Sequence, residues 1–217
     1  SSSERTVRLA DVAPSAPGYP PGLWRDRELA RARHRLRVPA DVPAGEYRVR
    51  AVAGGRRLDI GAVTVASAPR TTQAPTLEHS VEVDFGTVRL LGYEIRPSRP
   101  VPGHELLVTL AWRAESNSPE DAAVFVHLYD DASAIVAQHD GVPADGSRPL
   151  AGWLAGEVVT DVHRFVVPSG VAVGQRLRLA VGLYDPVGGE RLSVVGPRGE
   201  RPEDRAWTLT ELAAAAP

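Results

Sequence analysis

The chain has 217 residues, of which 43% are hydrophobic and 24% charged, enough to bury a core and too balanced for disorder or a membrane-embedded fold. It contains no cysteine and no methionine, and all 25 positive residues are arginine, which excludes disulfide scaffolds, thiolate nucleophiles, iron–sulfur clusters, lysine Schiff bases and P-loop lysines. The formal net charge is −2 and the arginines are interspersed with acids, so we expect no nucleic-acid partner.

Nineteen prolines and twenty glycines divide the chain into short runs in which apolar and polar residues alternate. Such runs are typical of antiparallel strands with one buried face. We expect strands at 46–53, 58–65, 87–95, 105–113, 122–130, 134–139, 158–167, 176–185 and 205–212. The fold class that this pattern predicts is all-β, an antiparallel β-sandwich of immunoglobulin-like or jelly-roll type.

An internal repeat relates two distant parts of the chain. With an offset of 129, residues 7–45 align without a gap to residues 136–174, and twelve of the 39 aligned positions are identical. The identical pairs are Val7/Val136, Asp11/Asp140, Pro14/Pro143, Pro20/Pro149, Trp24/Trp153, Glu28/Glu157, His34/His163, Arg35/Arg164, Val38/Val167, Pro39/Pro168, Val42/Val171 and Gly45/Gly174. Because 158–167 has the pattern of a strand, the equivalent 29–38 is predicted to be a strand too, although 26–35 is rich in helix formers.

The repeat also predicts the domain organisation. Residues 79–213 contain a complete sandwich module, 67–78 is a polar linker with prolines, and 1–66 matches only the carboxy-terminal half of the module. A half sandwich has open edges and a bare inner face. We therefore expect 1–66 to pack against the full module or against a second chain, so self-association is one predicted property.

Two tryptophans are the first candidates for a binding site. Trp24 and Trp153 occupy equivalent positions after a proline-containing turn, where an indole either caps one end of the sandwich or stacks on a sugar ring. Asp140 and Glu157 complete the ligand-binding set. Capping is the first interpretation of the tryptophans, and a carbohydrate-binding platform is the alternative, which exposure of the two rings would distinguish.

The histidines and carboxylates form no motif for a metal or for catalysis. His127, His139 and His163 can meet only if their strands are neighbours, and no His-x-His or His-Glu-x-x-His spacing occurs, so we predict no metal site. His127 shares a face with Phe125 and Tyr129, as a half-buried imidazole with satisfied hydrogen bonds would. Loop aspartates leave a structural calcium open within the carbohydrate-binding alternative. We expect no cofactor, no catalytic residue and no enzymatic activity.

A series of short motifs between residues 91 and 192 occurs in an order that resembles one family. The motifs are Leu91-Gly-Tyr-Glu-Ile95, Pro102-Gly-His-Glu-Leu106, Val108-Thr-Leu-Ala-Trp112, Val124-Phe-Val-His-Leu128, Gln138-His-Asp-Gly141, Gly152-Trp153 with Gly156-Glu157, and Gly182-Leu-Tyr-Asp185 with Arg191-Leu192. They resemble the extracytoplasmic β-sandwich modules at the carboxy-terminal end of multi-pass bacterial membrane glycosyltransferases, the mannosyltransferase-like family. The resemblance covers 78–212 and, as a partial copy, 7–65.

The resemblance implies an extracytoplasmic accessory module, tethered to the membrane through a longer parent chain. A glycan or the membrane domain of that parent would be its partner. The acidic catalytic motif of these transferases belongs to their membrane-embedded part and has no counterpart in this sequence, so the resemblance carries over no catalytic residue.

Overall fold

The computed structural model describes residues 6–12, 19–34, 36–66, 69–117 and 121–216. The chain divides into two compact units, Ser1–Ala68 and Pro69–Pro217. Two of the repeat identities, Pro14 and Arg35, and the start of the predicted linker at 67–68 lie outside the described residues. No helix in the described part of the chain has the length and apolar character that crossing a bilayer requires.

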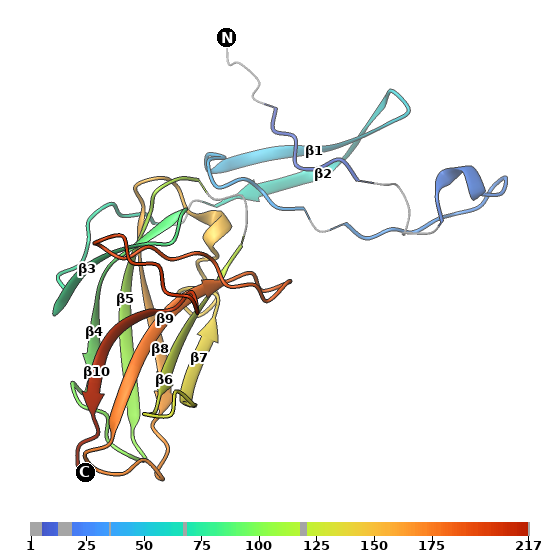
Figure 1. The fold of residues 1–217 in the computed structure, drawn as a ribbon. Helices are drawn as coiled ribbons and strands as arrows, with labels where there is room; N and C mark the ends of the chain where they lie inside the picture. The colour runs from blue at the N-terminus through green and yellow to red at the C-terminus, as the bar shows by residue number, and fades with distance from the viewer. Residues whose placement is uncertain (1–5, 13–18, 35, 67–68, 118–120, 217) are drawn as a thin grey trace. The chain divides into compact units, whose positions relative to one another are not determined.

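The second unit consists of two four-stranded antiparallel sheets, so the all-β sandwich predicted from the sequence is confirmed (Figure 1). The first sheet has the order β3-β4-β5-β8, and the second has the order β10-β9-β6-β7. Their strands are β3 His79–Asp84, β4 Val88–Arg96, β5 Glu105–Ala114, β6 Ala123–Tyr129, β7 Ile135–Gly141, β8 Val158–Val166, β9 Arg176–Tyr184 and β10 Trp207–Ala213. The chain passes from one sheet to the other after β5, after β7 and after β8.

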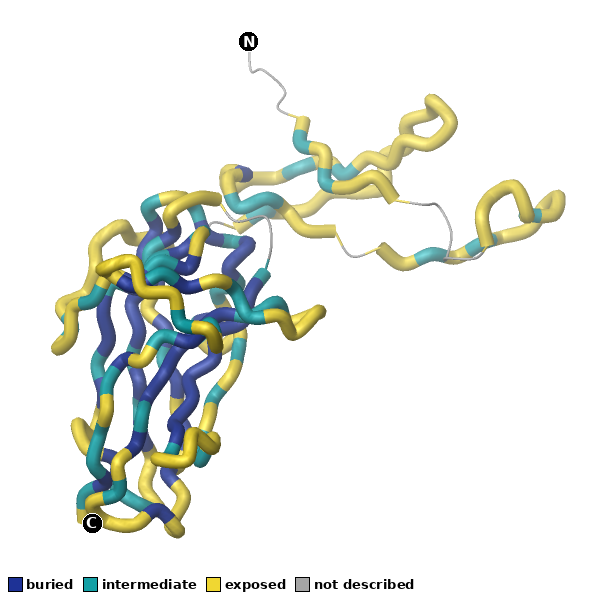
Figure 2. Tube along the Cα trace, viewed as in Figure 1, coloured by how far each residue is buried: buried dark blue, intermediate teal, exposed yellow. Residues whose placement is uncertain are grey.

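The core of the second unit lies between the two sheets, as the buried segments in Figure 2 show. Alternate residues of β9 and β6 point into it, because every second side chain of a strand lies on the same face. Strand β6 is buried along its whole length, since it is central in its sheet and its outer face is covered as well. This strand therefore reads as a continuous apolar run in the sequence.

The first unit contains one hairpin, β1 Gly45–Ala53 with β2 Arg56–Val65, and a short 3₁₀ turn, η1 Pro21–Leu23. The strand predicted at 29–38 is wrong, because its described residues form no strand. In the second unit the equivalent strand, β8, is held by a ladder of pairs to β5. The described part of the first unit contains no strand equivalent to β5, so the segment lacks its ladder partner.

All nine strands predicted from alternation are present, with ends that differ by at most two residues. Strand β3 is not among them, although Ser80 to Val83 alternate between polar and apolar residues; the run is short, and its pairing with β4 shifts register between Ser80 and Val83. The predicted linker is also shorter than expected. Thr71 pairs with Val158 in an isolated bridge, so the chain from Pro69 onward belongs to the second unit.

Candidate functional site

The tryptophan turns of the two units have the same local structure. Each follows a 3₁₀ turn, η1 in the first unit and η2 Leu150–Gly152 in the second. The indole of Trp24 donates to the carbonyl oxygen of Tyr19 at 3.3 Å, and the indole of Trp153 donates to that of Arg148 at 2.9 Å. Tyr19 and Arg148 are themselves equivalent under the 129-residue offset, so the repeat is a structural repeat at this turn.

A glutamate closes each turn in the same way. Glu28 accepts a hydrogen bond from the amide of Arg25 at 2.8 Å, and Glu157 accepts one from the amide of Leu154 at 3.0 Å. In the first unit this hydrogen bond, followed by one from the Tyr19 hydroxyl, holds the pKa of Glu28 below its ordinary value. The carboxylates therefore serve the fold of the turn.

The two glutamates differ in their remaining partners. Glu157 is 2% exposed and forms ion pairs with Arg70 and Arg148. Glu28 is exposed and accepts from the Tyr19 hydroxyl at 2.7 Å. A buried carboxylate that two guanidinium groups neutralise has no free oxygen to offer a ligand. The expectation that Glu157 contacts a ligand is therefore corrected to a structural role.

The alternative prediction, that Trp153 stacks on a sugar ring, is also corrected. Trp153 is 1% exposed and belongs to the core, so neither face of its indole is open to a sugar ring. Trp24 is half-buried and keeps part of its ring accessible. The structure therefore places the two tryptophans at equivalent positions with unequal exposure, and burial excludes stacking on a sugar at Trp153 alone.

Asp140 lies on the outer face of the second sheet, away from Trp153 and Glu157. Its carboxylate contacts Nε2 of His127 at 3.0 Å, and Nδ1 of that ring lies 3.1 Å from the hydroxyl of Tyr129. Burial lowers the pKa of His127, against the opposing effect of the Asp140 charge. The predicted satisfied imidazole at His127 is confirmed.

Arginines cover the aromatic rings beside His127. The guanidinium of Arg191 lies 4.3 Å from the ring centre of Phe125, and that of Arg178 lies 4.2 Å from the ring centre of Tyr129. Both distances are within the range of cation–π contacts. The rings on this face are therefore already stacked by the protein itself.

A second polar cluster joins the edge strands β7 and β8. His163 on β8 has its Nε2 2.8 Å from the carboxylate of Asp161 and its Nδ1 2.9 Å from Nδ1 of His139 on β7. Asp161 also accepts from the amide of Ala144 at 2.8 Å. Asp161 and His163 are buried, whereas His139 is half-buried. The described residues contain no group of three or more metal-ligating side chains arranged around a common centre.

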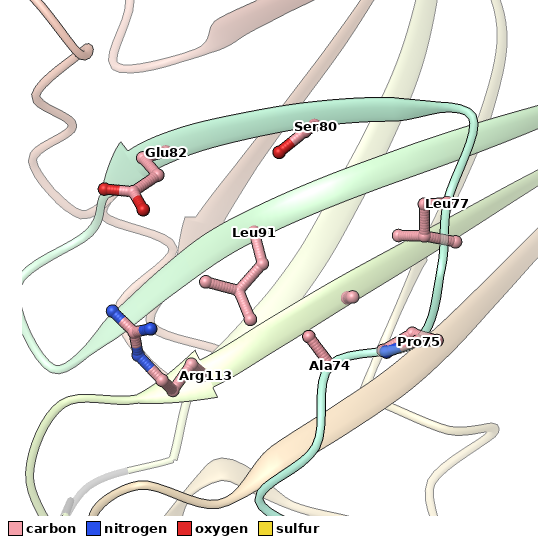
Figure 3. Close-up of a pocket in the computed structure, with 8 residues that line it drawn as sticks. Ala74, Pro75, Leu77, Ser80, Glu82, Leu91 and Arg113 are labelled. Atoms are coloured by element: carbon pink, nitrogen blue, oxygen red, sulfur yellow. The ribbon is translucent and has the colours of Figure 1, made fainter.

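A small hollow of about 270 Å³ lies on the outer face of the first sheet, beside the 74–77 segment (Figure 3). Its floor includes Leu91, and Glu82 and Arg113 lie at one end. Glu82 pairs with Arg89 at 3.4 Å, and Arg113 pairs with Glu115 at 2.9 Å. The lining therefore combines an apolar floor with charges that neighbours neutralise, which does not single out a ligand.

The hairpin of the first unit carries an apolar face that is partly exposed, with Tyr47 and Val49 half-buried and the other members exposed. This hairpin face consists of Tyr47, Val49 and Ala51 on β1 and of Leu58 and Val63 on β2, which stand opposite Ala51 and Tyr47. Leu58 is 64% exposed and Val63 is 44% exposed. Arg48, Arg50 and Asp59 lie on the opposite face, where both arginines approach the aspartate.

In the second unit the equivalent face is the core. Past residue 45 the repeat continues with an offset of 130, so β1 corresponds to β9 and Tyr47 corresponds to Leu177. The inward residues of β9, Leu177, Leu179, Val181 and Leu183, are each at most 1% exposed. Sequence alternation identifies the hairpin face, but it does not reveal that this face is less buried than its equivalent on β9.

Comparison with known proteins gives only remote likenesses. No family model matches the chain, and no curated protein matches it. A β-glucuronidase from glycoside hydrolase family 2 is 11% identical over 48% of this chain and 11% of its own length, with a TM-score of 0.32. A protein described as ApaA from Bordetella pertussis is 15% identical over 64% of this chain and 97% of its own, with a TM-score of 0.27. At these TM-scores neither likeness carries an argument about function.

Proposed function

We propose that the chain is a non-catalytic β-sandwich interaction module, and that its first unit docks strands supplied by a partner. The observation that carries this proposal is the exposed hairpin face, whose equivalents on β9 form the core of the second unit. An apolar face of this kind on a strand pair marks an interaction surface.

The second unit indicates which strands are missing from the first. Strand β9 lies between β10 and β6, and β8 pairs with β5. In the first unit β1 pairs only with β2 among the described residues, so no described strand lies on the side of β1 that corresponds to the β6 side of β9. A partner strand along this side of β1 extends the sheet, which is the β-augmentation mode of recognition, and sets its own apolar side chains beside Tyr47, Val49 and Ala51.

The expected gain comes from apolar burial. Fully burying one side chain of the size of valine or leucine contributes roughly 1.5–3 kcal/mol. An exposed ion pair such as Arg50 with Asp59 contributes at most about 1 kcal/mol. Apolar contacts between a docked strand and the side chains of Tyr47, Val49 and Ala51 therefore outweigh the ion pairs as a source of affinity.

The test uses a synthetic peptide with the sequence of β6, Ala123–Tyr129, between solubilising ends, titrated against the full chain. The peptide is expected to bind and to displace a hydrophobic dye from the hairpin face. The full-chain variant Val49→Asp with Ala51→Asp is expected to lose both signals, because it places charges on β1 directly beside the apolar side chains of the docked peptide.

A matched control peptide carries aspartate in place of Val124, Val126 and Leu128, which form the inward face of β6. This peptide keeps the length of the probe and loses its apolar face, so it is expected not to bind. Equal binding of the two peptides, or binding that the double variant leaves unchanged, would contradict the proposal.

A glycan is the second candidate ligand, because Trp24 keeps its indole partly accessible beside Tyr19 and Glu28. On a glycan array the full chain should then bind at least one sugar class, and Trp24→Ala should abolish that signal. Trp153→Phe serves as the control, because the indole of Trp153 is buried. Binding that survives Trp24→Ala rejects this candidate.

The proposed location is extracytoplasmic, within an envelope protein of the membrane glycosyltransferase type. The ordered motifs between Leu91 and Leu192 support it. Fractionation of the native host with an antibody against the second unit tests it. Recovery of the chain from the envelope fraction is the expected result, and recovery only from the cytoplasmic fraction rejects it.

A further inference from the structure

The two units carry opposite net charges. Ser1–Ala68 contains twelve arginines and seven acidic residues, a formal charge of +5. Pro69–Pro217 contains thirteen arginines and twenty acidic residues, a formal charge of −7. The near-neutral total of −2 therefore conceals a basic unit and an acidic unit.

Basic residues surround the hairpin face at its open end. Arg56 and Arg57 begin β2 directly after the Gly54-Gly55 turn, and all four residues are exposed. Arg48 follows on the opposite face of β1, with 76% of its side chain exposed. An apolar face with a basic rim selects a partner surface of the opposite sign.

Exposed carboxylates occur along the second unit. The side chains of Glu78, Glu82 and Glu190 are 55%, 65% and 78% exposed. Asp130 and Asp131 are adjacent at the end of β6. Glu78, Glu82 and Glu190 each lie within ion-pair distance of a basic side chain, namely His79, Arg89 and Arg205. The surplus of acidic residues over arginines nevertheless leaves this unit negative as a whole.

We propose that the partner of the first unit is a second copy of this chain, with the basic hairpin of one copy docked on the acidic second unit of another. This inference rests on the proposed function, because it assigns the occupant of the same hairpin face. Each copy offers one basic and one acidic surface, so the contact is heterologous and joins copies head to tail. Because salt screens the attraction between the basic and acidic surfaces, association is strongest at low ionic strength.

Sedimentation of the full chain at 50 mM and 500 mM NaCl measures the association directly. The expected result is a mass above the 23.2 kDa monomer at low salt, with an association constant that falls at least tenfold at high salt. The charge reversal Arg56→Glu with Arg57→Glu is expected to weaken low-salt association at least tenfold.

The matched control is Arg198→Glu with Arg201→Glu. It changes the net charge by the same amount at two exposed positions of the acidic unit, and it is expected not to weaken association. A monomer at both salt concentrations overturns the inference, and so does equal weakening by the two double variants.

The same samples separate this inference from the proposed function. A chain that stays monomeric, binds the β6 peptide, and loses that binding in the Val49→Asp with Ala51→Asp variant keeps the docking function and excludes a second copy as the partner. A chain that neither associates nor binds the peptide contradicts both proposals.

Discussion

Trp24 and Trp153 follow the same turn and donate the same indole hydrogen bond, yet only Trp153 is buried. The turn is made of contacts between residues close in sequence, so it forms in both units. The strand after it forms only in the second unit, where β8 pairs with β5. The comparison teaches that a local hydrogen-bonded motif is preserved where a strand ladder is not, because the ladder depends on distant residues.

Removing each tryptophan gives the largest contrast between the units. Trp153→Ala is expected to cost roughly 3–5 kcal/mol in the free energy of unfolding, because it empties a packed core position. Trp24→Ala is expected to cost under about 1 kcal/mol, because Trp24 is partly exposed and does not belong to a packed core cluster. Urea denaturation followed by circular dichroism measures both, and equal costs would show that the two turns are equally packed.

Neutralising the turn glutamates should give the next largest difference in stability between the two units. Glu157→Gln is expected to lower the free energy of unfolding by about 3 kcal/mol, because Arg70 and Arg148 lose the charge that they pair with. Glu28→Gln is the matched control and is expected to change stability by less than about 1 kcal/mol. A loss of unfolding free energy below about 1 kcal/mol for Glu157→Gln would contradict ion pairing of Glu157 with Arg70 and Arg148.

A methyl group at Gly182 tests how tightly the outer face of β9 is packed. It would lie 2.2 Å from Cζ of Phe125, so Gly182→Ala is expected to cost about 1–3 kcal/mol. The equivalent residue in β1 is Val52, which is exposed, and Val52→Ala should stay within about 0.5 kcal/mol. Thermal unfolding of both variants gives the comparison, and a tolerated Gly182→Ala would indicate a mobile Phe125 ring.

The smallest expected effect is the acid sensitivity of the first turn. The pKa of Glu28 lies below its ordinary value of 4.5, first because the Arg25 amide donates to it and then because of Tyr19. A lowered folded-state pKa contributes stability above the ordinary value, and this is lost as the pH falls through the folded-state pKa. The amide shift of Arg25 in an NMR titration should therefore change with a midpoint below 4.5, and a midpoint at or above 4.5 would contradict the hydrogen bond.

Alternation in the sequence predicts most of the fold, because strands with one buried face must alternate. Strand β3 follows this rule, with Ser80 and Glu82 exposed and Val83 buried, but the alternating run is only four residues long and includes a register shift. The strand predicted at 29–38 fails for another reason. Its pattern is copied from β8, but the strand that should pair with it is absent from the described first unit.

The site was less predictable than the fold. The sequence identifies Trp153 and Glu157, but Arg70 lies 87 residues before Glu157, in a segment that reads as a linker. Local spacing cannot indicate that these two side chains form an ion pair in the second unit. Asp140 was singled out as a ligand residue, and only the pairing of β6 with β7 explains why it meets His127.

The contact between His139 and His163 gives the two rings unlike tautomers. In the contact between Nε2 of His163 and the carboxylate of Asp161 the ring nitrogen donates and the oxygen accepts, which leaves Nδ1 of a neutral His163 ring to present a lone pair. The facing Nδ1 of His139 then donates, which leaves Nε2 of that half-buried ring as the basic nitrogen. Alkylating reagents should therefore modify His139 at Nε2. Nitrogen-15 shifts should identify Nε2 as the protonated nitrogen in His163 and Nδ1 as the protonated nitrogen in His139. The two edge strands would thus be linked by a hydrogen bond whose polarity is set by a carboxylate in the interior.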